Sequence, residues 1–220
     1  MKPSFFRPLA AAAVFAAFAI TPAVAQTLLD KARDAVRDAG KAGVAAAIEG
    51  GATIVQYRFS GYDRRSAYRE ALRLRHITRE RSVPLLINDA VDLAAAVDAD
   101  GVHLGQRDLP PSAARRILGE RACIGLSITD ARQLEDVECS FADYLGVGPV
   151  FATGSKADAA PPLGIAGLSA IVGGTSLPCV AIGGIGEENA GMVAATGVAG
   201  IAVVSALSTA VDPRATAGVL

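Results

Sequence analysis

Short apolar runs alternate with longer amphipathic stretches along most of the chain, and Gly or Pro bounds many of these runs. This alternation predicts repeated β-α units, in which buried parallel strands are covered by amphipathic helices. The expected strands from residue 52 onward are Ala52–Tyr57, Pro84–Ile87, Gly101–Leu104, Ala122–Leu126, Tyr144–Val147, Pro178–Ile182 and Gly200–Val204. The expected helices include Ser66–Glu80, Pro111–Leu118, Asp130–Val137, Glu187–Ala195 and a last one at Pro213–Leu220 that looks truncated.

Residues 1–26 support two interpretations. Lys2 and Arg7, the apolar run Leu9–Ile20 and the triplet Ala23–Ala25 together have the three-part form of a secretory signal, which would be cleaved on export. Alternatively, Ala13–Thr21 is a first strand, because a closed eight-stranded sheet needs one strand before the first helix. We favour the strand, which gives a single-domain (β/α)8 TIM barrel with its other β/α units in residues 27–220.

Composition narrows the class of protein. Half of the residues are hydrophobic and 20% are charged, a balance that supports a large buried core. The formal net charge of -1 provides no broad basic field, so we expect no nucleic-acid partner. The apolar N-terminal run is too short and too rich in Ala for a stable membrane anchor, which needs about 20 residues. Cys123, Cys139 and Cys179 have no C-x-x-C spacing and are odd in number, so we expect a reducing, cytoplasmic compartment, unless the N-terminal signal directs export. Cys123 and Cys179 lie within apolar runs and are expected in the core.

Polar residues collect where the predicted strands end, and in a parallel barrel these C-terminal strand ends carry the catalytic groups. The second to fifth strands are followed by Gln56, Arg58, Asn88, Asp89, Gly105, Gln106, Asp108 and Ser127. The sixth strand leads to Thr153, Ser155 and Lys156, whose hydroxyl groups and cation suit a phosphorylated ligand. The last two strands end in Gly183–Gly184 and Val204–Ser205, at the usual phosphate site of this fold. Two anion subsites are therefore expected.

Asp89 and Asp108 stand on neighbouring strand ends, so their carboxylates are candidates to hold one Mg2+ together with waters and pyrophosphate oxygens. The alternative is that both residues cap helices, and their spacing alone does not decide between the two. Neither histidine is a good catalytic candidate. His103 is expected in the core and His76 on a solvated helix.

Six runs of sequence, at 50–58, 88–94, 99–110, 143–151, 181–185 and 203–206, closely resemble thiamine-phosphate synthase in order and spacing. The resemblance implies a transferase of thiamine biosynthesis. Such an enzyme couples 4-amino-2-methyl-5-hydroxymethylpyrimidine pyrophosphate to hydroxyethylthiazole phosphate, with Mg2+ as cofactor, and releases pyrophosphate. It further implies a dissociative displacement that needs no protein nucleophile.

The resemblance also assigns roles to individual residues. It places the pyrimidine and its pyrophosphate at Gln56, Arg58, Asn88, Ser127 and Lys156, with Arg58, Ser127 and Lys156 as the catalytic groups. It places the thiazole phosphate at Thr153, Ser155, Gly183, Gly184, Val204 and Ser205, and the metal at Asp89 and Asp108. The chain departs from the family at Phe59 and Ser60, which replace an acidic residue and a Lys, and at Thr21–Pro22 and Ala152.

Three other functions compete with this interpretation. A thiazole tautomerase-like homologue would keep the barrel, but Gly105, Gln106 and Asp108 argue against it. A non-catalytic barrel that binds a phosphate ligand is suggested by Ser60 and by the signal-like start of the chain. An isomerase or epimerase of sugar phosphates would need an acid/base pair that the sequence does not display. The expected partners are small phosphorylated substrates, and the sequence is compatible with a homo-oligomer.

Overall fold

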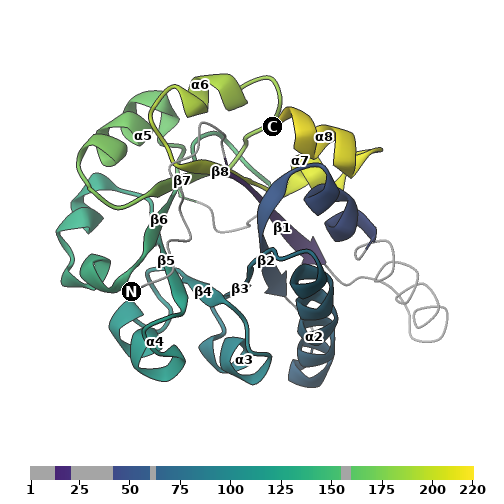
Figure 1. Ribbon diagram of the computed structural model, residues 1–220. Helices are drawn as coiled ribbons and strands as arrows, with labels where there is room; N and C mark the ends of the chain where they lie inside the picture. Colours follow the sequence, from purple (N-terminus) through teal and green to yellow (C-terminus); the bar gives the residue numbers. More distant parts are fainter. Residues whose placement is uncertain (1–12, 21–41, 60–62, 155–159) are drawn as a thin grey trace.

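Eight parallel strands close into a barrel in the order β1 to β8 (Figure 1). The computed structural model describes residues 13–20, 42–59, 63–154 and 160–220. The strands are β1 (Ala13–Ile20), β2 (Ala52–Phe59), β3 (Leu85–Asn88), β4 (Gly101–Leu104), β5 (Cys123–Ile128), β6 (Tyr144–Val147), β7 (Cys179–Ile182) and β8 (Gly200–Val203). The seven strands expected after residue 52 all form, with ends shifted by no more than two residues.

The backbone of β1 completes the barrel by pairing with both the second and the last strand. Phe18 is aligned with Tyr57 of β2, and Phe15 is aligned with Ala202 of β8. Residues 1–12 and 21–41 lie outside the described part of the chain, and with them Thr21–Pro22. That residues 1–26 are retained in the working protein stays a prediction.

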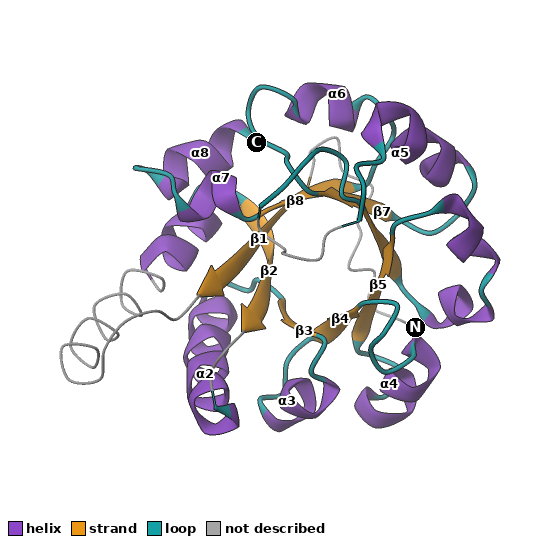
Figure 2. Cartoon of the chain, turned by 180° about the vertical axis from the view of Figure 1, so that it is seen from behind, coloured by secondary structure: helices purple, strands orange, loops and turns teal. Residues whose placement is uncertain are grey.

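Helices surround the strands on the outside of the barrel (Figure 2). Residues 42–49 are helical, and the helices that follow are α2 (Arg64–Glu80), α3 (Val91–Ala96), α4 (Pro111–Leu118), α5 (Gly164–Gly173), α6 (Ala190–Ala194), α7 (Ser205–Ser208) and α8 (Pro213–Val219). The Asp63 side chain caps α2 by accepting from the backbone N–H of Ser66, and this helix buries Ala67, Ala71 and Leu74 against the strands. No helix in the described ranges is both long and apolar enough to cross a bilayer.

The prediction of an α-helix over Asp130–Val137 is wrong. Two 3-10 helices, Ala131–Glu135 and Val137–Phe141, stand there instead. Asp136 separates them because its backbone is extended, with ψ 129°, and its side chain accepts from the N–H of Glu138. The Glu187–Ala195 helix is also shorter than expected and begins only at Ala190.

Alternate residues of the strands pack into two separate apolar clusters. One cluster joins the outward strand residues, such as Val55, Ile87 and Leu145, to residues of the surrounding helices. The other contains strand residues alone and therefore fills the inside of the barrel; it is formed by Ile54, Leu86, Cys123, Tyr144, Val180 and Ala202.

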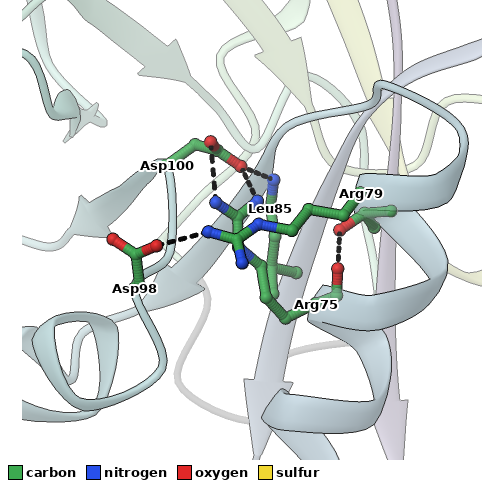
Figure 3. A network of polar contacts seen from close by, with 6 residues as sticks. Arg75, Arg79, Leu85, Asp98 and Asp100 are labelled. Carbon is green, nitrogen blue, oxygen red and sulfur yellow. Dashed lines mark hydrogen bonds and ion pairs between the residues drawn. The ribbon is translucent and has the colours of Figure 1, made fainter.

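At the N-terminal ends of the strands, two carboxylates each join a helix to a neighbouring strand. Asp100, just before β4, accepts from the guanidinium of Arg75 at 2.6 Å and from the backbone N–H of Leu85 at 2.7 Å (Figure 3). Asp143, just before β6, repeats the arrangement with Arg115 at 2.7 Å and the N–H of Ile124 at 2.9 Å. These contacts stabilise the face opposite the strand ends that carry the candidate site.

Candidate active site

A polar layer lies directly above the apolar cluster inside the barrel. Because side chains alternate along a strand, Gln56 and Asn88 face the same way as Ile54 and Leu86, one step nearer the C-terminal strand ends. The Gln56 amide donates from Nε2 to Oδ1 of Asn88 at 2.7 Å, so the structure brings these two predicted residues into direct contact. Arg58, two residues beyond Gln56, is half-buried at the same end of β2.

Ser127 is held by contacts with two residues of the preceding β4 unit. Its hydroxyl lies 2.9 Å from Nε2 of His103, and its backbone carbonyl accepts from the Gln106 amide at 2.8 Å. The other ring nitrogen of His103 lies 2.8 Å from the hydroxyl of Tyr144. The expectation that His103 is a partnered core histidine is confirmed, but its contact with the candidate Ser127 was not anticipated.

Asp89 and Asp108 are not helix caps. The N-cap positions of α3 and α4 are Ala90 and Pro110, and neither helix has a side-chain cap. Asp89 has a left-handed backbone, with φ 62°, and its N–H donates to the carbonyl of His103 at 2.8 Å, which fixes it beside the end of β4. Asp108 closes a turn there, because its Oδ2 accepts from the N–H of Gly105 at 2.7 Å.

These two carboxylates fit a Mg2+ site that a ligand completes. Magnesium in enzymes is commonly held by one or two carboxylates together with substrate phosphates and water. Both side chains are exposed on adjacent strand ends, and the turn contact of Asp108 uses only one of its oxygens. No group of three or more His, Cys, Asp or Glu side chains able to hold a metal occurs in the described ranges, so an all-protein cage is not formed there.

The loops after β6 and β7 are fastened to each other. Val150 and Phe151 donate their N–H groups to the carbonyls of Ile182 and Gly183, at 2.9 and 3.0 Å. Gly183 and Gly184 have φ of 99° and 65°, and a Cβ on either would lie within 2.7 Å of the β6 loop. Only glycine permits this close approach of two backbones.

The remaining predicted phosphate residues are divided between described and undescribed parts of the chain. Thr153 is half-buried in the loop after β6, and Val204 and Ser205 stand at the start of α7, directly after β8. Ser155, Lys156 and Ser60 lie outside the described residues.

The cysteines take no part in this site. All three are buried and free of disulfides, and the expectation that Cys123 and Cys179 are core residues is confirmed. Burial raises the pKa of the Cys123 thiol to about 12 and that of Cys179 to about 11. Thiols of this kind stay protonated near neutral pH and are poor nucleophiles.

The chain is similar in sequence to known proteins of one family. A family model described as "Thiamine monophosphate synthase" matches residues 27–207. A thiamine-phosphate synthase of Laribacter hongkongensis is 52% identical over 170 residues, which cover 77% of this chain and 80% of the relative. One of Chloroflexus aurantiacus is 51% identical over 177 residues, which cover 80% of this chain and 82% of the relative.

A solved structure extends the likeness to the fold. Thiamine phosphate pyrophosphorylase from Pyrococcus furiosus superimposes with a TM-score of 0.78 at 36% identity and covers 94% of this chain and 93% of its own. The sequence likeness, the shared barrel and the polar residues at its strand ends lead to one conclusion: the chain belongs to the thiamine monophosphate synthase family.

Proposed function

We propose that this protein is a thiamine-phosphate synthase. This transferase joins 4-amino-2-methyl-5-hydroxymethylpyrimidine pyrophosphate to hydroxyethylthiazole phosphate. The observation that carries the proposal is the polar layer of Gln56, Asn88 and Ser127 beside Asp89 and Asp108, in a chain about half identical to curated synthases. This layer offers amide groups to a polar ring and carboxylates to a metal–pyrophosphate group.

The pyrimidine ring is proposed to bind at Gln56. The bond from Gln56 Nε2 to Asn88 holds the amide in one orientation, and its carbonyl oxygen and second N–H are the groups that complement an aminopyrimidine edge. Because the same bond occupies Oδ1 of Asn88, the Asn88 NH2 group remains as a donor for the pyrophosphate.

The pyrophosphate is proposed to bind between Arg58, Ser127, Lys156 and the two carboxylates. When bound at Asp89 and Asp108, Mg2+ would neutralise the negative charge that builds up on the leaving group. Arg58 and Lys156 would add positive charge, and Ser127 would donate a hydrogen bond to a pyrophosphate oxygen. The thiazole phosphate is proposed to bind the loops that carry Thr153, Ser155, Gly183, Gly184, Val204 and Ser205.

The reaction then needs orientation and charge stabilisation rather than a protein nucleophile. The C–O bond to pyrophosphate breaks with its electron pair leaving on oxygen, and a pyrimidinylmethyl cation remains. The thiazole nitrogen donates its lone pair to form the new C–N bond. No proton is transferred in this step, which is consistent with a His103 that is occupied by Ser127 and Tyr144.

The test is synthesis by the full-length protein. We expect thiamine phosphate from both phosphorylated substrates with Mg2+, and loss of product when EDTA is added. A Ser60→Lys variant restores the cation that the family has at this position and should raise turnover. Product from Ser60→Lys but not from the natural chain would favour the non-catalytic phosphate-binding alternative. No product from either chain would contradict the synthase.

We also propose that residues 1–26 are retained and that the enzyme is cytoplasmic. Support comes from the backbone of β1, which supplies one of the eight strands. Mass spectrometry of the protein isolated from its own cells should find peptides from Ala13–Ile20 in the soluble fraction. An exported chain that begins at Gln26 would contradict this.

A further inference from the structure

A continuous polar chain crosses three strands inside the barrel and ends on Ser127. The Tyr144 hydroxyl on β6 lies 2.8 Å from Nδ1 of His103 on β4, and His103 Nε2 lies 2.9 Å from the Ser127 hydroxyl on β5. Tyr144 itself is only 1% exposed and packs in the apolar cluster inside the barrel. A buried hydroxyl is costly unless it is hydrogen-bonded, so Phe would be the simpler residue if packing were the only requirement.

Two glycines make room for this chain. Gly125 of β5 is aligned with both His103 and Tyr144, and a Cβ at Gly125 would come within 2.4 Å of the Tyr144 hydroxyl. Gly146 is aligned with Ser127, and a Cβ there would come within 2.6 Å of Cε1 of His103. The interior is thus shaped so that both rings reach across β5.

The direction of the hydrogen bonds depends on the tautomer of His103, which a donating phenol at Tyr144 would set. Burial raises the pKa of Tyr144 well above its usual value, so the hydroxyl keeps its proton and can donate to Nδ1 of His103. A neutral imidazole that accepts at Nδ1 carries its proton on Nε2 and donates it to the Ser127 oxygen. With that oxygen accepting from His103, the hydroxyl proton of Ser127 is directed to another acceptor.

We propose that His103 is a positioning residue which, with its tautomer set by Tyr144, orients the Ser127 hydroxyl as a donor to the pyrophosphate of the substrate. The inference rests on the proposed contact between Ser127 and pyrophosphate and adds two residues that this contact depends on. If His103 served packing alone, its replacement would lower stability without any specific dependence on Ser127.

The variants separate these roles by the position of their polar atoms. The amide nitrogen of His103→Gln can take the place of Nε2 and still donate to Ser127, whereas the shorter His103→Asn reaches only the place of Nδ1. Tyr144→Phe keeps the ring and removes the hydroxyl. Ser127→Ala removes the group on which His103 is proposed to act.

The measurement is the affinity of the full-length protein for inorganic pyrophosphate with Mg2+, by titration calorimetry, with each variant's melting temperature as a check of folding. We expect Ser127→Ala and His103→Asn each to weaken binding about 10-fold, the effect of one hydrogen bond to a charged group. The double variant should be no weaker than Ser127→Ala alone. His103→Gln should recover most of the affinity, and Tyr144→Phe should weaken it by a few fold.

Several results would overturn the proposal. These are an unchanged affinity in His103→Asn, an effect of equal size with and without the Ser127 hydroxyl, or no binding of pyrophosphate by the natural chain. If His103→Asn does not fold, the effect of Tyr144→Phe, compared with and without the Ser127→Ala substitution, decides in the same way. Because binding is measured without the thiazole substrate, a failure of synthesis alone would count against the proposed function and not against this coupling.

Discussion

The Asp108 carboxylate has two roles, one structural and one proposed, which two substitutions can test separately. One oxygen accepts from the N–H of Gly105 and closes the turn, and the side chain is proposed to bind Mg2+. Asp108→Asn keeps an oxygen for the turn but loses the negative charge, whereas Asp108→Ala loses both. We expect both variants to lower turnover by at least about 100-fold at limiting Mg2+, and only Asp108→Ala to lower the melting temperature as well.

The response of turnover to Mg2+ concentration is the deciding measurement for this site. The asparagine variant should need far more Mg2+ for half-maximal rate than the natural chain. An unchanged dependence on Mg2+ would remove Asp108 from the metal site.

The thiols provide a pH-dependent check of the core. Since folding raises the pKa of Cys123 from 9.0 to about 12, both the native and the unfolded thiol are protonated below pH 9 and stability is unaffected there. Between pH 9 and 12 the unfolded thiol ionises first, so the free energy of unfolding falls as pH rises.

At pH 8 a thiol reagent should label none of the three cysteines in the native protein and all of them in urea. Rapid labelling of the native chain would contradict their burial.

At the scale of residues, the sequence predicts which side chains lie at the strand ends, but it does not predict the contacts between side chains inside the barrel. Gln56, Asn88 and Ser127 could be predicted because strand alternation and strand ends place them at the barrel mouth. The contact between His103 and Tyr144 could not be predicted, because it spans the intervening strand β5 and depends on the space left by Gly125 and Gly146. Strand alternation is a signal that both rings face inward, but not that they meet.

The α2 helix carries two ion pairs one turn apart that differ in burial. Arg75 binds Asp100 with side-chain exposures of 12% and 26%, while Arg79 binds Asp98 with 60% and 81% (Figure 3). Arg75→Ala leaves a partly buried carboxylate without its cation and should cost about 2–3 kcal/mol of unfolding free energy. Arg79→Ala should cost less than about 0.5 kcal/mol, since exposed pairs contribute little.

Urea unfolding of the two variants checks this directly, because both replace the same residue type in the same helix. Equal losses would mean that the Asp100 bridge contributes no more than an exposed pair. A larger loss in Arg79→Ala would contradict the account.

At the scale of elements, the strands were predictable and several helices were not. Strands show as apolar runs because both of their faces are buried in a barrel. The α5 helix has no polar face to reveal its period, and its ten residues include Gly164, Gly167 and Gly173. The 3-10 segments follow from the local hydrogen bonds of Asp130 and Asp136, which the hydrophobic period does not record.

The whole molecule depends on its first strand for closure. A chain that begins at Gln26 lacks β1 and leaves β2 and β8 with unpaired edges. We expect this chain to be poorly soluble and to lose cooperative unfolding, while a chain that begins at Leu9 keeps β1 and unfolds like the natural protein. The measurement is circular dichroism in urea. An unchanged unfolding midpoint for the chain from Gln26 would show that β1 is dispensable.

Closure by β1 also affects how the protein forms during its synthesis. The strand made first pairs with β8, whose first residue follows about 180 positions later. At roughly 5–20 residues per second, translation of that interval takes on the order of 10–40 s. Until β8 is made, at least one of the two neighbours of β1 is missing, so this apolar strand is available to the cell's targeting and chaperone systems. We therefore expect the barrel to close only late in synthesis, once β8 has been made.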